Sequence, residues 1–157
     1  PVDKSSRLRE LKGVLKSKKK ETDIVNGETA PSLLVIDDER VLNDILQETL
    51  RAAGYKVEGA YDGVEGIEKL RHQKYNLVLL DIRMPRKDGL DVLKFIRREY
   101  PEVKVIIITG LASLPEIKET VKLGAFACLK KPFLLERVIE TIEQALDINK
   151  TEKDSQE

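Results

Sequence analysis

Carboxylates, a hydroxyl and an ammonium group each follow a short apolar run in this sequence, a pattern that suits phosphate chemistry. The runs at 33–36, 77–80, 105–108 and 127–129 are followed by Asp37-Asp38, Asp81, Thr109 and Lys130-Lys131. If the runs are neighbouring parallel strands, these groups meet at the carboxyl edge of one sheet, where ligands bind in open α/β folds. Such a site could hold a divalent metal and accept a phosphoryl group on an aspartate.

The location of each group predicts its role. Crowded carboxylates repel one another unless a cation is present, and a hard divalent ion such as Mg²⁺ prefers oxygen ligands. We therefore expect Asp37-Asp38 to hold Mg²⁺ directly or through water, and Asp81, at the end of the central strand, to be the nucleophile toward phosphorus. Lys131 would pair with phosphoryl oxygens and Thr109 would donate a hydrogen bond to them, while Gly110 leaves room for the incoming group.

Hydrophobic periodicity predicts five strand–helix units between Ser32 and Ile148. In the first helix, which Gly54 stops, apolar residues recur with a period of about 3.6. These residues are Val41, Leu42, Ile45, Leu46 and Leu50. Asp62 is expected to cap the second helix. The later helices are expected from Leu90 to Glu99, from Pro115 to Gly124 and from Leu134 to Leu146.

The composition of the strands predicts their order in the sheet. The three runs that end at Asp37, Asp81 and Thr109 are apolar on both faces, as strands covered by helices on both sides must be. The run from Lys56 to Ala60 is mixed and the run at 127–129 is short, so both are expected at the edges. The predicted fold is α/β, a doubly wound five-stranded parallel sheet of order 2-1-3-4-5 with helices on both faces.

Composition excludes several classes of function. The 157 residues carry 28 basic and 28 acidic side chains, so no overall field favours nucleic acid or a membrane surface. No apolar stretch approaches the roughly 20 residues that span a bilayer. A single cysteine permits no internal disulfide, and we expect a cytoplasmic location. The only histidine, His72, is expected at the surface, which excludes a Ser-His-Asp triad and a histidine metal cluster.

Two tails are expected beside a domain at 32–148. Residues 1–20 contain eight basic and two acidic residues, a net charge of +6, and Leu8, Leu11 and Leu15 could form one narrow helical stripe. Segment 1–31 is therefore a solvated tail, a linker helix to an upstream domain, or a basic arm for an acidic partner. Residues 149–157 are polar and expected to fray. A start at Pro1 indicates a processed chain or a piece of a longer one.

These motifs resemble the receiver domains of two-component response regulators. The resemblance covers residues 32–148 and rests on four motifs in order: Asp37-Asp38, Asp81-Ile82-Arg83-Met84-Pro85 with Asp88-Gly89, Thr109-Gly110, and Lys131-Pro132-Phe133. Asp81 lies 43 residues after Asp38, 28 before Thr109 and 50 before Lys131, spacings that the family shares. Each motif alone is weak, but all four at these spacings make a chance resemblance improbable.

The resemblance implies a signalling domain rather than an enzyme. Asp81 would receive a phosphoryl group from a sensor histidine kinase or a histidine phosphotransfer protein, with Mg²⁺ as cofactor. The main-chain carbonyl of Arg83 would complete the metal site, and the Lys131–Pro132 peptide would be cis. Phosphorylation would draw Thr109 and Lys131 inward and change the surface of the fourth helix, fifth strand and fifth helix. An effector protein, self-association, or a domain of a longer regulator or hybrid kinase would carry the output.

One position departs from the family pattern and keeps an alternative open. Most receivers carry Tyr or Phe three residues before the site lysine, where this chain has Cys128, and Phe126 is not expected to substitute. Cys128 is interpreted as a small core residue. A receiver-like interaction module that is never phosphorylated is the alternative. A phosphatase is disfavoured because Arg83 occupies the place of its second acid, and flavin binding because Asp37-Asp38 would repel a phosphate.

Overall fold

The computed structural model describes residues 29–84, 88–110 and 113–148. The predicted stripe of Leu8, Leu11 and Leu15, the polar segment 149–157 and Pro85 lie outside these ranges. None of the helices in the described ranges is long and apolar enough to cross a bilayer.

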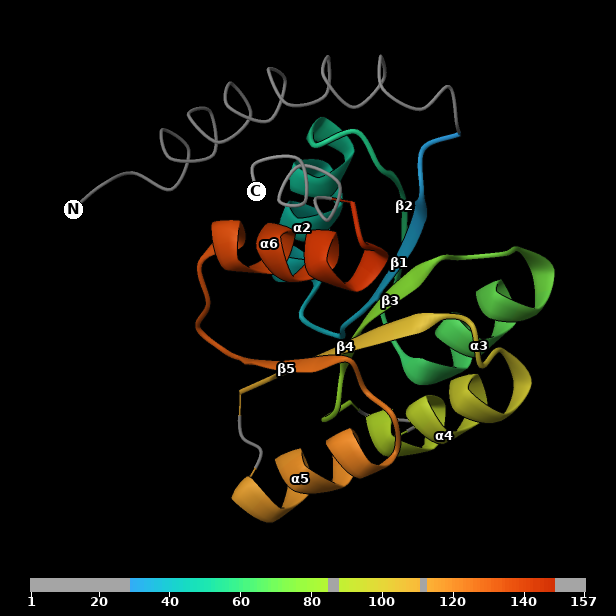
Figure 1. Cartoon of the computed structure of the whole chain (residues 1–157), viewed down its shortest axis with the longest axis vertical. Coiled ribbons are helices and arrows are strands. Elements are labelled where there is room, and N and C mark those ends of the chain that lie inside the picture. The colour runs from blue at the N-terminus through green and yellow to red at the C-terminus, as the bar shows by residue number, and fades with distance from the viewer. Residues whose placement is uncertain (1–28, 85–87, 111–112, 149–157) are drawn as a thin grey trace, which may run out of the picture.

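Five strands form one parallel sheet in the order β2-β1-β3-β4-β5 (Figure 1). They are β1 (Ser32–Ile36), β2 (Lys56–Ala60), β3 (Leu77–Asp81), β4 (Lys104–Thr109) and β5 (Ala127–Lys130). The central strands β1, β3 and β4 are almost wholly buried, whereas each edge strand has exposed positions. The predicted fold class and strand order are therefore confirmed.

Five helices in the described ranges connect and follow the strands. They are α2 (Arg40–Ala52), α3 (Gly63–His72), α4 (Gly89–Glu99), α5 (Leu114–Lys122) and α6 (Leu135–Leu146). Figure 1 shows α2 and α6 on one face of the sheet and α3, α4 and α5 on the other. Each face has its own apolar layer: Leu79 belongs to the layer beneath α2 and α6, and Leu80 to the layer beneath α3 and α4. Burial of these layers is the main stabilising term of the fold.

Helix ends follow the signals in the sequence. The Asp62 side chain accepts a hydrogen bond from the Glu65 N–H at 2.8 Å, and this confirms the predicted cap of α3. Gly54 after α2 and Gly124 after α5 have φ values of 102° and 96°, a left-handed conformation that glycine adopts without steric penalty. His72, at the end of α3, is exposed as predicted.

The buried stripe of α2 differs from the prediction at Val41. The periodicity placed Val41 among the apolar positions, yet its side chain is 75% exposed, while the polar Asn43 and Gln47 are buried. The buried side of α2 carries Asn43 rather than Val41, because the Asn43 amide donates hydrogen bonds to main-chain carbonyl groups near the carboxyl ends of β1 and β2. Polar side chains therefore satisfy strand ends at positions that an apolar stripe would otherwise occupy.

Candidate functional site

Strand register brings the predicted carboxylates together. Ile36 pairs with Leu80, so the residue after each of them, Asp37 and Asp81, lies at the carboxyl ends of adjacent strands. Asp37, Asp38 and Asp81 each offer a carboxylate oxygen, and these oxygens all lie within 4.8 Å of one another. Asp37 and Asp81 are buried, whereas Asp38 reaches solvent. The cluster therefore lies at the carboxyl edge of the sheet, at its topological switch point.

The ammonium group of Lys131 lies among carboxylates. Its Nζ is 2.8 Å from Asp37 Oδ2, 3.0 Å from Glu39 Oε1 and 3.2 Å from Asp81 Oδ2. The sequence prediction gave Lys131 phosphoryl oxygens as partners, and in this structure carboxylate oxygens take that place. Glu39 was not among the predicted site residues, although a third consecutive acid at the end of the first strand is a readable signal.

Burial and nearby charge alter the protonation of two site groups. Burial, followed by the negative charge of Asp37, raises the pKa of Asp81 to about 6, against the opposing influence of Lys131 and the Arg83 N–H. Burial alone would lower the pKa of Lys131, but its hydrogen bonds to Asp37 and Glu39 raise it overall. Lys131 is therefore cationic at neutral pH. Lys131 thus does not fully offset the effects of burial and of the Asp37 charge on Asp81, and a bound divalent cation would stabilise the ionised carboxylates further.

The hydroxyl of Thr109 is buried at the end of β4. Only 1% of this residue is exposed, and its Oγ1 has no hydrogen-bond partner among the described residues. A buried hydroxyl without a hydrogen-bond partner costs about 1–3 kcal/mol, so a ligand oxygen that accepts a hydrogen bond from it would be stabilising. Beside it, a Cβ at Gly110 would lie 3.8 Å from the Lys131 Cβ and Cδ atoms, an ordinary van der Waals contact, so a methyl group would fit next to the lysine side chain.

The loop after β3 is held against the acidic cluster. The Arg83 N–H donates to Asp81 Oδ1 at 3.1 Å, and Arg83 Nη2 forms an ion pair of 2.6 Å with Glu116 Oε1 on α5. The Gly89 N–H donates to the Ile82 carbonyl at 2.8 Å, and a Cβ at Gly89 would overlap the main-chain carbonyl oxygen of Asp81. Only glycine allows this close approach of two main-chain segments. Sequence reasoning placed Asp88-Gly89 in a motif but did not foresee this contact.

The last features of the predicted motif, the peptide bond after Lys131 and the side chain of Cys128, lie in β5 and directly after it. The Lys131–Pro132 peptide is cis, as the resemblance implied. Cys128 is half-buried against the apolar layer beneath α3 and α4, and burial raises the pKa of its thiol. The thiol is therefore protonated at neutral pH, which agrees with a small core residue.

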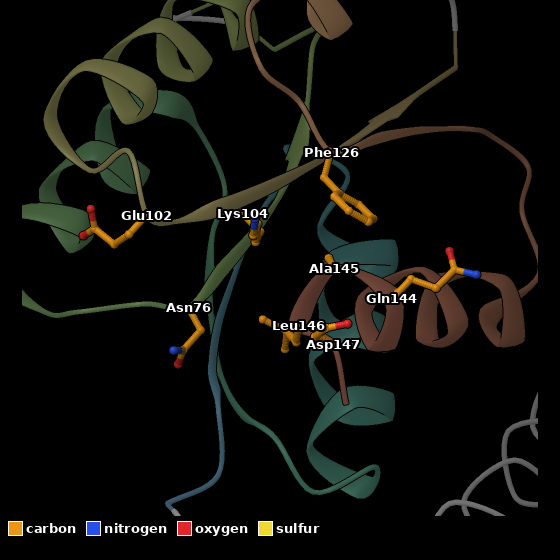
Figure 2. A pocket seen from close by; sticks show the side chains of 8 residues that line it. All are labelled: Asn76, Glu102, Lys104, Phe126, Gln144, Ala145, Leu146 and Asp147. Atoms are coloured by element: carbon orange, nitrogen blue, oxygen red, sulfur yellow. The ribbon is translucent and has the colours of Figure 1, made fainter. Parts of the chain in front are cut away.

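Phe126 does not replace the missing aromatic side chain. It precedes β5, and its N–H donates to the Val105 carbonyl at 2.7 Å, far along β4 from Thr109. Its ring lines a cavity of about 530 Å³ together with Lys104, Glu102 and residues at the end of α6 (Figure 2). This cavity lies at the amino edge of the sheet, opposite the edge that carries the carboxylates. The predicted site residues Asp37, Asp38, Asp81, Thr109 and Lys131 all lie at the carboxyl edge, away from this cavity.

Comparison with known proteins agrees with this geometry. The family model of the response regulator receiver domain matches residues 33–143. The chain is 39% identical over 114 residues to the transcriptional regulatory protein ZraR of Salmonella typhimurium, a match that covers 73% of this chain and 26% of ZraR. It is 33% identical over 124 residues to the response regulator MprA of Mycobacterium avium, covering 79% of this chain and 54% of MprA. The chain thus spans about a quarter to about half of these curated relatives.

Solved structures show the same architecture. A receiver domain protein (CheY-like) from Methanospirillum hungatei superposes with a TM-score of 0.74 at 32% identity, covering 78% of this chain and 98% of that one. NtrX from Brucella abortus gives a TM-score of 0.72 at 29% identity, covering 81% of this chain and 30% of NtrX. With the family model matched over 33–143 and the strand order observed, the chain belongs to the family of response-regulator receiver domains.

Proposed function

We propose that this chain is the phosphoacceptor of a two-component phosphorelay and that Asp81 is the residue phosphorylated. The observation that carries the proposal is the grouping of Asp37, Asp38 and Asp81 within 4.8 Å, with the Lys131 ammonium 3.2 Å from Asp81. Family membership supports the same chemistry. The donor is a sensor histidine kinase or a histidine phosphotransfer protein.

The phosphorylation step is a nucleophilic displacement at phosphorus. A carboxylate oxygen of Asp81 forms the new bond to phosphorus while the bond between phosphorus and the donor's leaving group breaks, and the leaving group keeps the electron pair. Lys131 is close enough to neutralise the charge of the phosphoryl oxygens. The Thr109 hydroxyl donates a hydrogen bond to one of those oxygens, and Gly110 leaves space for them. Positioning and charge neutralisation supply most of the catalysis in such transfers.

Mg²⁺ is the proposed cofactor. Asp37, Asp38 and Asp81 would hold it with the main-chain carbonyl of Arg83, an all-oxygen donor set of the kind that this ion prefers. When bound, the ion neutralises charge on the carboxylates and on the phosphoryl oxygens. The raised pKa of Asp81 is consistent with this assignment, because a bound cation would offset both of its causes, the burial of the carboxylate and the negative charge of Asp37.

The output is a change at the surface formed by α5, β5 and α6. A phosphoryl group adds about −1.5 to −2 charges, which attracts the Thr109 hydroxyl and the Lys131 ammonium. Thr109 ends β4 just before the connection to α5, and Lys131 follows β5 just before the connection to α6. Their movement would therefore be transmitted to both helices. The changed surface would bind an effector protein or a second copy of the chain, or contact an output region of a longer protein.

Intact mass spectrometry tests the proposal. The chain is incubated with acetyl phosphate, with and without Mg²⁺, alongside Asp81→Asn and the control Asp91→Asn, which removes an exposed carboxylate in the first turn of α4. We expect one phosphoryl adduct on the wild-type chain and on Asp91→Asn, only with Mg²⁺, and no adduct on Asp81→Asn. A folded wild-type chain that gives no adduct would contradict the proposal and favour an interaction module that works without phosphorylation.

A further inference from the structure

A row of three polar side chains, two of them buried, runs along α2 beside the acidic site. Asn43, Gln47 and Arg51 are four residues apart, so they follow one another along the same side of the helix. Arg51 Nη2 donates to Gln47 Oε1 at 3.1 Å, and Gln47 Nε2 donates to Asn43 Oδ1 at 2.7 Å. Asn43 is completely buried. None of these three residues belongs to the motifs that identify the family.

The direction of these hydrogen bonds is determined by Arg51. A guanidinium group has donors and no acceptor, so the Gln47 oxygen must face Arg51 and the Gln47 nitrogen must face Asn43. The Asn43 oxygen is then used as an acceptor, and its nitrogen remains available to donate. Arg51 itself is anchored, because its Nη2 also donates to the Val57 carbonyl at 2.8 Å. The amide of Asn43 therefore has one satisfied orientation.

The Asn43 amide nitrogen donates hydrogen bonds to main-chain carbonyl groups beside the acidic site. Its Nδ2 lies 2.9 Å from the carbonyl oxygen of Asp37, 2.8 Å from that of Ala60 and 3.3 Å from that of Val35. The Asp37 N–H donates to the same Ala60 carbonyl at 3.1 Å. Both main-chain polar groups of Asp37 are thus held at the ends of β1 and β2.

We propose that Asn43 is a positioning residue of the acidic site, one that fixes the main chain of Asp37 so that its carboxylate meets Asp81 and Lys131. The inference rests on the proposed function for the assignment of Mg²⁺ to this cluster. Asn43 touches no reacting atom and acts through Asp37. Groups that orient a metal ligand in this way typically change metal affinity by 10–100-fold when they are lost.

Gly59 offers a second way to disturb the same row. A Cβ at this position would overlap the Gln47 amide and lie 2.7 Å from Asn43 Oδ1. Gly59→Ala would therefore displace Gln47 and reorient Asn43, while every carboxylate residue of the site and Lys131 remain unsubstituted. If Asn43 positions the site, this substitution weakens Mg²⁺ binding although it lies on β2 and contacts no predicted ligand.

Calorimetric titration of the full chain with Mg²⁺, without phosphodonor, tests the inference beside urea unfolding of the same samples. The variants are Asn43→Ala, Gly59→Ala and the control Val138→Ala, which removes buried methyl groups from α6, on a different helix. We expect Asn43→Ala to raise the Mg²⁺ dissociation constant about tenfold or more, and Gly59→Ala to raise it several-fold. Val138→Ala should lower the free energy of unfolding and keep the wild-type dissociation constant.

Each outcome separates positioning from general stability. Wild-type Mg²⁺ affinity in folded Asn43→Ala overturns the inference, as does an equal loss of affinity in Val138→Ala. If Asn43→Ala does not fold, the same comparison is made with Gly59→Ala, and wild-type affinity there overturns the inference. A wild-type chain that binds Mg²⁺ but accepts no phosphoryl group contradicts the proposed function, while the variants still decide the role of Asn43. A wild-type chain that binds no Mg²⁺ overturns both.

Discussion

The carboxyl group of Asp81 is buried beside Asp37, and its pKa is raised to about 6, above the value of about 3.9 for an unfolded chain. The folded state therefore binds this proton more tightly than the unfolded state does. The free energy of unfolding of the metal-free chain should accordingly fall as pH rises from about 4 to about 6, and stay low above that range. Allowing for screening by solvent, we expect Asp81 to contribute about 1–2 kcal/mol to this decrease.

Asp81→Asn removes the titrating group and should therefore stabilise the metal-free chain at pH 7. Urea unfolding in EDTA at constant ionic strength, from pH 4.5 to pH 8, compares the variant with the wild type. The variant should lose part of the pH dependence between about pH 4 and pH 6, and added Mg²⁺ should stabilise the wild type more than the variant. A metal-free wild type that is more stable than Asp81→Asn at pH 7 would show that the ion pair with Lys131 outweighs burial and repulsion.

Glu39 competes with an incoming phosphoryl group for Lys131. Its Oε1 is 3.0 Å from Lys131 Nζ, and its side chain is 61% exposed, so it adds negative charge at the entrance of the site. Glu39→Gln should raise the initial rate of phosphorylation by acetyl phosphate about fivefold, which corresponds to about 1 kcal/mol of charge repulsion near a surface. The rate is measured from the adduct mass over time. Glu99→Gln makes the same change of charge at the end of α4, and an equal acceleration there would refute a local effect.

The residues proposed to do the chemistry could be predicted from the sequence, whereas the residue proposed to position them could not. Asp37, Asp38, Asp81 and Lys131 end apolar runs, so strand patterning alone brought them to one edge. The partners of Asn43 are carbonyl oxygens 6, 8 and 17 residues away in sequence, and only the folded chain brings them together. A polar side chain at every fourth position of a helix, beside the apolar stripe, was the signal available for this row.

Among the elements, the strands were easier to predict than the close contacts between loops. Runs that are apolar on both faces identify strands covered by helices on both sides, and the mixed run at Lys56–Ala60 identified an edge. The predicted helix limits lie within two residues of the observed ones, because helix ends depend on local signals such as the cap at Asp62 and the glycines Gly54 and Gly124. The approach of Gly89 to the end of β3 depends on tertiary geometry, which periodicity does not encode.

Substitution by alanine should destabilise the fold at Gly89 but have little effect on stability at Gly110, although both glycines lie beside the site. Gly89→Ala would force its Cβ into main-chain atoms of Asp81 and Ile82, so the loop after β3 must move. We expect a loss of about 2 kcal/mol or more in the free energy of unfolding, with weaker Mg²⁺ binding. Gly110→Ala places its Cβ 3.8 Å from Lys131 side-chain atoms, an ordinary contact, and should change stability by no more than about 0.5 kcal/mol. Urea unfolding and Mg²⁺ titration of both variants provide the check, and equal destabilisation would contradict the steric account.

Across the whole domain, β4 and β5 connect the acidic edge of the sheet to the proposed output surface of α5, β5 and α6. β4 and β5 are paired in register up to Thr109 and Lys130, so the two groups proposed to contact phosphate lie at the ends of adjacent strands, Thr109 as the last residue of β4 and Lys131 directly after β5. A ligand changes a population of two states only through its difference in affinity for them, and inverting a ratio of 1:99 requires about 5.5 kcal/mol. Several contacts must contribute to such a difference. We expect the Thr109 hydroxyl to be one of them, because it has no partner among the described residues and would gain a phosphoryl oxygen.

Substitution of Thr109 should therefore separate phosphorylation from its transmission. Thr109→Val keeps the shape of the side chain and removes the hydroxyl, and Thr109→Ser keeps the hydroxyl. Because this hydroxyl is buried without a partner among the described residues, the Val variant should be about 1 kcal/mol more stable than the wild type before any ligand binds.

With Mg²⁺ and beryllofluoride, a phosphoryl mimic, amide resonances next to Asp81 should shift in all three proteins. Resonances of α5, β5 and α6 should shift fully in the wild type and in Thr109→Ser, and much less in Thr109→Val. Wild-type shifts of those elements in Thr109→Val would mean that the change reaches them through Lys131 alone.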